Sequence, residues 1–236
     1  MLRARAFSMP HTSMIIPAFN EEEAIALVLR GLPAGSVDDL IVADNGSTDA
    51  TASVAAANGA RVIRENQRGY GAACLAGIAA LNPSTEIVVF MDGDYSDDAG
   101  DLPAIVRPLV EAKADLVIGT RMTWRESRDA LSIPQRWGNW LATRLIRLRW
   151  RHAYTDLGPF RAITRSALEK IGMSDRGFGW TVEMQIKALR AGLRIIEVPV
   201  HYRRRVVGES KISGTVRGTI MAGAKILYVI GKYAWS

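Results

Sequence analysis

Cysteine is almost absent from the sequence, because Cys74 is the single one among 236 residues. One cysteine cannot form a disulfide within the chain, and without cysteine pairs or a cysteine–histidine cluster the usual kind of zinc site is excluded. We therefore interpret Cys74 as a small buried apolar residue and expect a reducing compartment.

Long apolar runs are also missing. No stretch of roughly 18 uncharged apolar residues occurs, which is about the length that a membrane-spanning helix requires. The N-terminal segment MLRARAFSMPHTS has no apolar core of the kind that signal peptides contain. We therefore expect a cytoplasmic protein that reaches a membrane only from its surface.

Three nucleotide-binding signatures are absent as well. There is no GxxxxGK[ST] loop, and Arg68-Gly69-Tyr70-Gly71 lacks the third glycine of a dinucleotide fingerprint because position 74 is cysteine. The GxGxR loop of nucleotidyltransferases does not follow the first predicted strand, where PAFNEE stands instead. P-loop enzymes, dehydrogenases and nucleotidyltransferases therefore lose support.

What is present is an ordinary globular composition with an excess of positive charge. Hydrophobic residues make up 48% and charged residues 23%, and the formal net charge is +6. The length favours one main domain, assigned to residues 1–213, followed by a C-terminal amphipathic helix at 214–236. A basic balance suits nucleic acid, anionic lipid or phosphorylated small molecules, and it does not choose among them.

Strand patterns alternate with helical patterns over the first 120 residues. Strands are expected at 13–16, 40–43, 61–63, 86–91 and 116–118, with helices at 20–31, 49–58, 71–81 and 101–112; a helix at 179–191 and a strand at 194–200 follow later. This alternation predicts an α/β fold whose mostly parallel central sheet has helices on both faces. Ligands bind such sheets beyond the carboxyl ends of the strands.

Acidic side chains stand at two of these strand ends. Asp92-Gly93-Asp94 follows the apolar strand EIVVFM, so both carboxylates can face a hard cation that neutralises a diphosphate. Taken alone, the pair is equally well explained as an exposed acidic turn extended by Asp97, Asp98 and Asp101. Asp44 ends another strand, where its carboxylate can accept hydrogen bonds from a nucleobase or ribose.

A basic run, Arg203-Arg204-Arg205, follows the last predicted strand, and Ser210-Lys211 comes shortly after it. One interpretation is a solvated charge cluster. The other is a loop that closes over donor phosphates or binds a phosphorylated acceptor.

The order of the motifs resembles a known family. MIIPAFNEE, DNGSTD, MDGD, GTR, GFGWTVEMQIKAL and YRRRVVGESKISG follow one another between about residues 12 and 215. Together they resemble family 2 glycosyltransferases of the GT-A fold, and within that family the polyprenyl (dolichyl) phosphate mannosyl- and glucosyltransferases.

The resemblance implies roles for individual residues. Donor-binding roles fall on Pro17, Ala18, Asn20, Glu21, Asp44, Gly93, Arg203, Ser210 and Lys211. Catalytic roles fall on Asp92, Asp94, Arg121, Asp156 and Glu183, with Arg121 at the acceptor phosphate or the reacting centre. Asp92 and Asp94 would hold Mg²⁺ or Mn²⁺ against the diphosphate of the nucleotide sugar.

The sequence departs from the family pattern in places. Many relatives carry a glutamine two residues after the second aspartate, where this chain has Ser96, so the third protein ligand of the metal is open. The usual Ser-Gly of the acceptor stretch is Gly158-Pro159 in DLGPFRA.

Two segments suggest a membrane surface. Residues 132–152 carry five arginines and no acid, and a helix there would align Trp137, Leu141, Leu145 and Leu148 in an apolar stripe, with Arg144 intruding and Ile146 facing away. Residues 214–236 form a second mildly apolar helix, interrupted by Lys225 and Lys232. Packing against the catalytic domain is the alternative for the first segment, and formation of a homo-oligomer is the alternative for the second.

These observations favour an inverting transfer of a hexose from GDP-mannose or UDP-glucose to a polyprenyl phosphate, at the inner face of the membrane. A lipid phosphate is already anionic, so no general base is needed. If the acceptor were instead a soluble or saccharide hydroxyl, Glu183 or Asp156 would be the candidate base. A non-catalytic protein that binds membranes or nucleic acid is the alternative of another class, and we expect no nucleic-acid partner because acidic strand ends repel phosphates.

Overall fold

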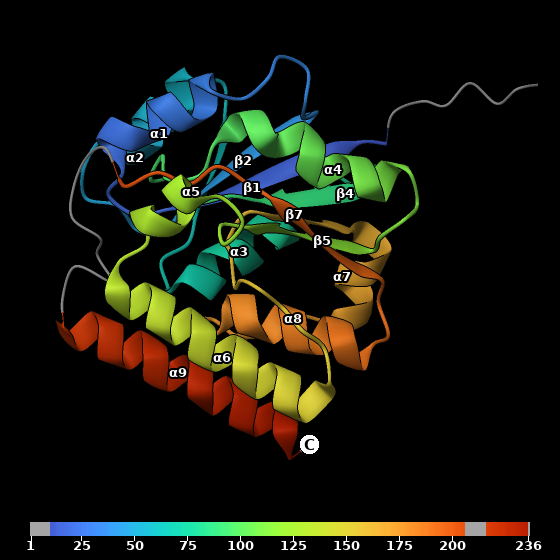
Figure 1. Ribbon diagram of the computed structural model, residues 1–236. Coiled ribbons are helices and arrows are strands. Elements are labelled where there is room, and N and C mark those ends of the chain that lie inside the picture. The colour runs from blue at the N-terminus through green and yellow to red at the C-terminus, as the bar shows by residue number, and fades with distance from the viewer. Residues whose placement is uncertain (1–9, 206–215, 236) are drawn as a thin grey trace, which may run out of the picture.

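A seven-stranded sheet organises the molecule (Figure 1). The computed structural model describes residues 10–205 and 216–235, with side chains of the latter segment from residue 221 onward. The strand order is β3-β2-β1-β4-β6-β5-β7. The strands are β1 (Thr12–Ala18), β2 (Asp39–Asp44), β3 (Arg61–Arg64), β4 (Ile87–Phe90), β5 (Leu116–Thr120), β6 (Arg161–Thr164) and β7 (Ile195–Pro199).

Most neighbouring strands are parallel, as the alternating pattern predicted. β1 pairs in parallel with β2 and β4, β2 with β3, and β5 with β7. β1 and β4 are buried along their whole length, which explains their continuous apolar sequences. The expected α/β fold with a mostly parallel sheet is therefore confirmed.

The sequence did not predict β6, which lies antiparallel between β4 and β5. It has only four residues, RAIT, and begins with a buried arginine, so neither apolar alternation nor a flanking turn signals it. Its position nevertheless matters. The last two residues of the DLGPFRA segment, Arg161 and Ala162, belong to β6 and pair with β4.

Helices cover both faces of the sheet, and the sheet separates the core into two clusters. α1 (Glu22–Arg30), α2 (Thr51–Ala57) and α4 (Leu102–Val110) pack with Met14, Ile16 and Val42 on one face. α3 (Tyr70–Ala79), α7 (Arg165–Ile171) and α8 (Trp180–Arg190) pack with Ile15, Ile41 and Phe90 on the other. A 3₁₀ turn (Ala99–Asp101) precedes α4, and the short α5 (Arg125–Ala130) follows β5.

Two long helices form an outer layer beyond α8. α6 (Ile133–Trp150) and α9 (Val216–Ala234) lie side by side along one edge of the molecule (Figure 1). Val229 and Ile230 of α9 are buried in the same core cluster as α8, and Arg149 Nε donates to the Ala234 carbonyl at 2.9 Å. Across residues 10–205 and 216–235, no helix combines the length and the apolar character that crossing a bilayer demands.

α6 is amphipathic, with an unusual outer face. Ile146, which was expected to face away from the apolar stripe, is fully buried against the protein core. Trp137 and Leu148 of the stripe are exposed, whereas Leu141 and Leu145 are half-buried. Ile133 and Trp140 add further exposed apolar surface to the same helix.

Candidate active site

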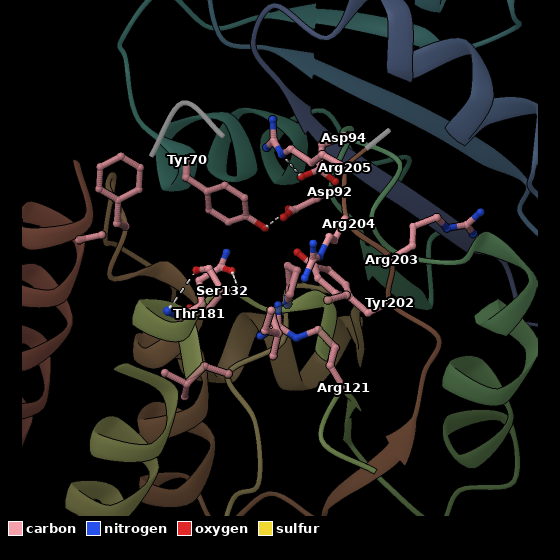
Figure 2. A pocket seen from close by; sticks show the side chains of 17 residues that line it. Tyr70, Asp92, Asp94, Arg121, Ser132, Thr181, Tyr202, Arg203, Arg204 and Arg205 are labelled. Carbon is pink, nitrogen blue, oxygen red and sulfur yellow. Dashed lines mark hydrogen bonds and ion pairs between the residues drawn. The ribbon is translucent and has the colours of Figure 1, made fainter. Parts of the chain in front are cut away.

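Two adjoining pockets open at the carboxyl ends of β1, β4 and β5, where the strand-end rule placed them. We call them the larger pocket, of about 530 Å³, and the smaller pocket, of about 310 Å³. Both are lined by the same central group of residues, Tyr70, Asp92, Asp94, Phe178 and Arg205. The acidic pair thus stands at the junction of the two pockets. Figure 2 shows it in the lining of the larger one.

Asp92 lies at this junction and is half-buried. The Tyr70 hydroxyl donates to its Oδ1 at 3.0 Å (Figure 2). Burial, together with the negative charge of Asp94, raises the pKa of Asp92 to about 7. Two carboxylates forced together in this way create a strong demand for a cation.

Within the protein, Asp94 forms an ion pair with Arg205. Arg205 Nε lies 2.7 Å from Asp94 Oδ2, and Arg205 Nη1 lies 3.1 Å from Glu21 Oε1. The Ser96 backbone N–H donates to the other oxygen, Asp94 Oδ1, at 2.9 Å. Burial alone would lower the pKa of Arg205, but Asp94 and Glu21 outweigh it and raise the pKa above its ordinary value.

The smaller pocket contains four of the predicted donor-binding residues, namely Pro17, Ala18, Glu21 and Gly93. Its lining also includes residues outside the predicted site set, among them Phe19, Asn45, Arg68 and Phe178. The Arg68 guanidinium lies over the Phe19 ring at 3.7 Å, so a planar cation and an aromatic ring form one wall. Such a wall suits a flat heterocyclic ring.

Asn20 and Asp44 do not line either pocket, although their chain neighbours Phe19, Glu21 and Asn45 line the smaller one. Asn20 Oδ1 accepts from the Thr48 backbone N–H at 2.8 Å, and Asp44 Oδ1 accepts from the Ser47 backbone N–H at 3.1 Å. The structure therefore gives these two side chains a role in shaping the loop after β2. Direct donor contact remains a prediction for them.

Arg121 and Asp156 form a buried ion pair at the larger pocket. Arg121 Nε and Nη2 donate to the two Asp156 oxygens at 2.7 and 2.8 Å, and the Arg121 backbone N–H adds a third contact at 2.9 Å. Burial alone would lower the pKa of Arg121, but the Asp156 carboxylate raises it overall. Asp156 is fully buried, so it holds Arg121 at the pocket wall rather than facing the pocket itself.

The basic run also reaches the larger pocket, which Arg203, Arg204 and Arg205 all line. Arg203 pairs with Asp98 at 2.9 Å and lies over the Tyr95 ring, whereas Arg204 makes a long 3.5 Å contact with the Asp129 carbonyl. The two further predictions of a donor loop, Ser210 and Lys211, lie outside the described residues.

Glu183 is not brought to either pocket. Its carboxylate accepts from the Ser174 hydroxyl at 2.7 Å, the Asp175 backbone N–H at 2.7 Å and the Tyr233 hydroxyl at 2.8 Å, and it pairs with Lys187 at 3.0 Å. Burial would raise the pKa of Glu183, but these hydrogen bonds lower it to about 2. The geometry gives Glu183 a structural task, which is to join α8 to the 174–179 segment and to α9.

The 174–179 segment carries Phe178 into both pockets. It packs so closely on the start of α3 that a Cβ at Gly69 or Gly71 would lie 2.0 Å from a backbone oxygen of Arg176 or Asp175. The Gly71 N–H donates to the Gly177 carbonyl at 3.2 Å. The glycines of RGYGAAC thus permit a close backbone approach, which fixes Tyr70 and Phe178 together at the junction of the pockets.

The alternative interpretation of the acidic pair, an exposed acidic turn extended by Asp97, is wrong for Asp97, which is buried. The side chain is 3% exposed, and within the described residues neither carboxylate oxygen has a hydrogen-bond partner. Burial, followed by the charge of Asp92, raises its pKa well above the ordinary value. The Ser96 hydroxyl beside it is also buried without a partner in the described chain.

Comparisons with known proteins agree with this geometry. Residues 13–172 match the model of the family named Glycosyl transferase family 2. An uncharacterised glycosyltransferase of Mycobacterium bovis is 41% identical over 214 residues, which cover 89% of this chain and 93% of that protein. The undecaprenyl-phosphate mannosyltransferase of Micrococcus luteus is 32% identical, with 86% and 88% of the two chains covered.

A solved structure is also similar over most of its length. The glucosyl-3-phosphoglycerate synthase from Mycobacterium tuberculosis, in complex with Mn²⁺, UDP and glucosyl-3-phosphoglycerate, superimposes with a TM-score of 0.74 at 26% identity, over 94% of this chain and 81% of that one. The family model covers more than half of the present sequence, and the bacterial relatives extend the match to nearly all of it. The chain therefore belongs to glycosyl transferase family 2 and is a glycosyltransferase.

Proposed function

We propose that the enzyme transfers a hexose from GDP-mannose or UDP-glucose to a polyprenyl phosphate at a membrane surface, with inversion at the anomeric carbon. The observation that carries this proposal is the larger pocket, where Arg121 and Arg204 converge beside the acidic pair (Figure 2). Arginines that converge on one pocket suit a phosphate group, which they bind through paired hydrogen bonds.

The donor belongs in the smaller pocket. Its volume of about 310 Å³ and its Arg68–Phe19 wall suit a nucleoside, with Asp92 and Asp94 at the end where the diphosphate would lie. The Mycobacterium tuberculosis synthase with Mn²⁺ and UDP supports this assignment by similarity.

A divalent cation fits the residues present. No cluster of three metal-ligating side chains occurs within the described residues, so the protein would supply Asp92 and Asp94, with donor phosphate oxygens completing the shell. The raised pKa of Asp92, caused by burial and then by Asp94, is the repulsion that such a cation would relieve. When bound, Mg²⁺ or Mn²⁺ would neutralise the leaving diphosphate.

The acceptor class is inferred from the carboxylates at the larger pocket that could act as a general base. Among the described residues, the carboxylates that line it are Asp92 and Asp94, which serve the metal, while Asp156 is paired with Arg121 and Glu183 lies elsewhere. A hydroxyl acceptor needs a general base within hydrogen-bond reach, whereas a phosphate oxygen does not. An anionic acceptor held by arginines is therefore the better match.

The lipid part of the acceptor is supported by the outer helices. Ser132 and Gln135 at the start of α6 and Ala222 of α9 line the larger pocket. The same helices carry exposed apolar side chains, which are Ile133, Trp137, Trp140, Leu148, Met221, Leu227 and Tyr228, and the exposed Trp235 directly follows α9. Exposed tryptophans interspersed with arginines suit a bilayer interface, so a prenyl chain could leave the pocket directly into the membrane. The similarity to the undecaprenyl-phosphate mannosyltransferase points the same way.

A second acceptor class has a specific argument behind it. The similar Mycobacterium tuberculosis synthase was crystallised with glucosyl-3-phosphoglycerate, so a small phosphorylated acceptor that reacts through a hydroxyl is the alternative. A hydroxyl acceptor would require a general base. For Asp156 to serve as that base, its ion pair with Arg121 would have to break.

A product screen separates these possibilities. The purified protein is incubated with Mn²⁺, each of the two donors, and either a short polyprenyl phosphate or 3-phosphoglycerate, and the products are identified by mass spectrometry. We expect a hexosyl polyprenyl phosphate from one donor, which the Asp94→Asn variant does not form. Transfer to 3-phosphoglycerate alone would refute the proposal.

A further inference from the structure

The Arg205 guanidinium lies between two carboxylates that come from distant parts of the chain. It contacts Asp94 Oδ2 at 2.7 Å, just after β4, and Glu21 Oε1 at 3.1 Å, just before α1 (Figure 2 shows the contact with Asp94). Arg205 is 25% exposed, Glu21 11% and Asp94 7%, so solvent screens these contacts much less than a surface ion pair.

We propose that Arg205 occupies, in the donor-free enzyme, the cation position of the acidic pair, and that it must leave before the divalent metal can bind Asp94. This inference rests on the metal site of the proposed function. A metal ligand oxygen lies about 2 Å from Mg²⁺ or Mn²⁺. A dication at that distance from Asp94 would stand within about 4 to 5 Å of the guanidinium, where the two positive charges repel each other.

The donor provides the place to which Arg205 moves. A nucleoside diphosphate entering the smaller pocket brings its negative charge next to Arg205, which lines that pocket. Guanidinium binds phosphate oxygens through two parallel hydrogen bonds. The diphosphate can therefore replace Asp94 as the ion-pair partner of Arg205. Asp94 is then released for the metal, and Glu21 is released for contacts with the donor.

Metal and nucleotide therefore bind cooperatively. Besides coordinating the metal directly, the nucleotide removes the competing Arg205 guanidinium from Asp94. By linkage, the nucleotide must strengthen metal binding by the same factor by which the metal strengthens nucleotide binding. An enzyme built in this way does not hold the metal firmly until a donor is present. Arg205 acts here as a positioning residue for the acidic pair.

The test measures Mn²⁺ affinity by electron paramagnetic resonance, in the full-length protein, without nucleotide and with UDP or GDP. Without nucleotide, Arg205→Gln should bind Mn²⁺ about tenfold more tightly than the wild type, which corresponds to the loss of one partly buried ionic competitor. Arg205→Lys keeps the charge and should stay within about threefold of the wild type. Arg203→Gln removes a charge two residues away, from a pair with Asp98, and should change the affinity less than about twofold.

The nucleotide arm supplies the second readout. UDP or GDP should increase Mn²⁺ affinity by a smaller factor in Arg205→Gln than in the wild type, because no competitor remains to be removed. Arg205→Met, which keeps the apolar stem, replaces Arg205→Gln if thermal melting shows that the latter does not fold.

The outcomes distinguish the inference from the proposed function. Equal Mn²⁺ affinities of the wild type and Arg205→Gln without nucleotide, with an equal nucleotide effect, would overturn the role of Arg205 and leave the metal site standing. Absence of Mn²⁺ binding to every variant, with and without nucleotide, would overturn both.

Discussion

The Tyr70 hydroxyl donates a hydrogen bond of 3.0 Å to Asp92 Oδ1 at the point where the two pockets meet. This bond leaves Oδ2 of Asp92 for other partners and fixes the orientation of a carboxylate that is otherwise destabilised by burial and by Asp94. Tyr70 is itself buried, which raises the pKa of its phenol well above the ordinary value and keeps it a donor at neutral pH.

The variant Tyr70→Phe tests this contact through the pH dependence of transfer. The hydrogen bond favours the charged form of Asp92, so its loss raises the pKa of Asp92 above about 7. Protons compete with the metal for the Asp92 carboxylate, so transfer at subsaturating Mn²⁺ should then fall at a higher pH on the acidic side than in the wild type. At neutral pH we expect a loss of about fivefold, the value of one hydrogen bond. An unshifted acidic limb would contradict the contact.

The Arg121–Asp156 pair predicts a loss of stability together with a loss of acceptor binding. Asp156→Asn leaves a buried guanidinium without its carboxylate, which costs about 3 to 5 kcal/mol of unfolding free energy. Denaturant unfolding measures this loss, and a raised KM for the acceptor should accompany it at temperatures where the variant stays folded. Unchanged stability with a reduced kcat would instead identify Asp156 as a general base.

Glu183 predicts a specific pH dependence of stability. Its pKa in the folded protein is about 2, below the ordinary value of 4.5, because of the hydrogen bonds from Asp175 and Ser174 that overcome burial. A lowered folded-state pKa stabilises the fold above about pH 4.5, and this contribution, about 3 kcal/mol, disappears as the pH falls toward 2.

Glu183→Gln should therefore be less stable at neutral pH and should show a flatter decline in unfolding free energy between about pH 4.5 and 2. Glu169→Gln, at an exposed pair with Arg165, is the control and should behave like the wild type. If both glutamine variants show the same profile, Glu183 does not hold α8 and α9 together as described.

The outer face of α6 predicts binding to membranes. Trp137 and Trp140 are 62% and 54% exposed, and replacing both by serine should weaken binding to anionic liposomes by about tenfold or more. Leu27→Ser is the control, because Leu27 is an exposed apolar residue of α1, at the far side of the sheet (Figure 1). Sedimentation with liposomes measures both. Equal sedimentation of the tryptophan variant and the wild type would exclude this face as the contact.

Much of the site could be predicted from the sequence because its residues lie at the carboxyl ends of strands. Parallel strands bring their carboxyl ends to one edge, so Pro17, Ala18 and the Asp92–Asp94 pair could be grouped without coordinates. The helical pattern of 132–152 also anticipated that Ile146 would point away from Trp137.

Other features depend on contacts between segments far apart in the chain, which no local pattern encodes. Arg205 reaches Glu21 across 184 positions, and Phe178 enters the pockets only because glycines let the 174–179 segment approach α3. Glu183 was placed near the sugar by resemblance, yet its carboxylate is engaged with α9, whose position the sequence pattern leaves open. β6 was missed because four residues with a buried arginine carry too little apolar signal.

The most direct test compares one acceptor in two forms, a short polyprenyl phosphate and the corresponding polyprenol, with the same nucleotide sugar and Mn²⁺. The measured quantity is the initial rate of hexose transfer, followed by mass spectrometry of the lipid product. A phosphate nucleophile held by arginines, with no general base among the described residues of the pocket wall, predicts hexosyl polyprenyl phosphate and no product from polyprenol. Transfer to polyprenol at a comparable rate would contradict that mechanism.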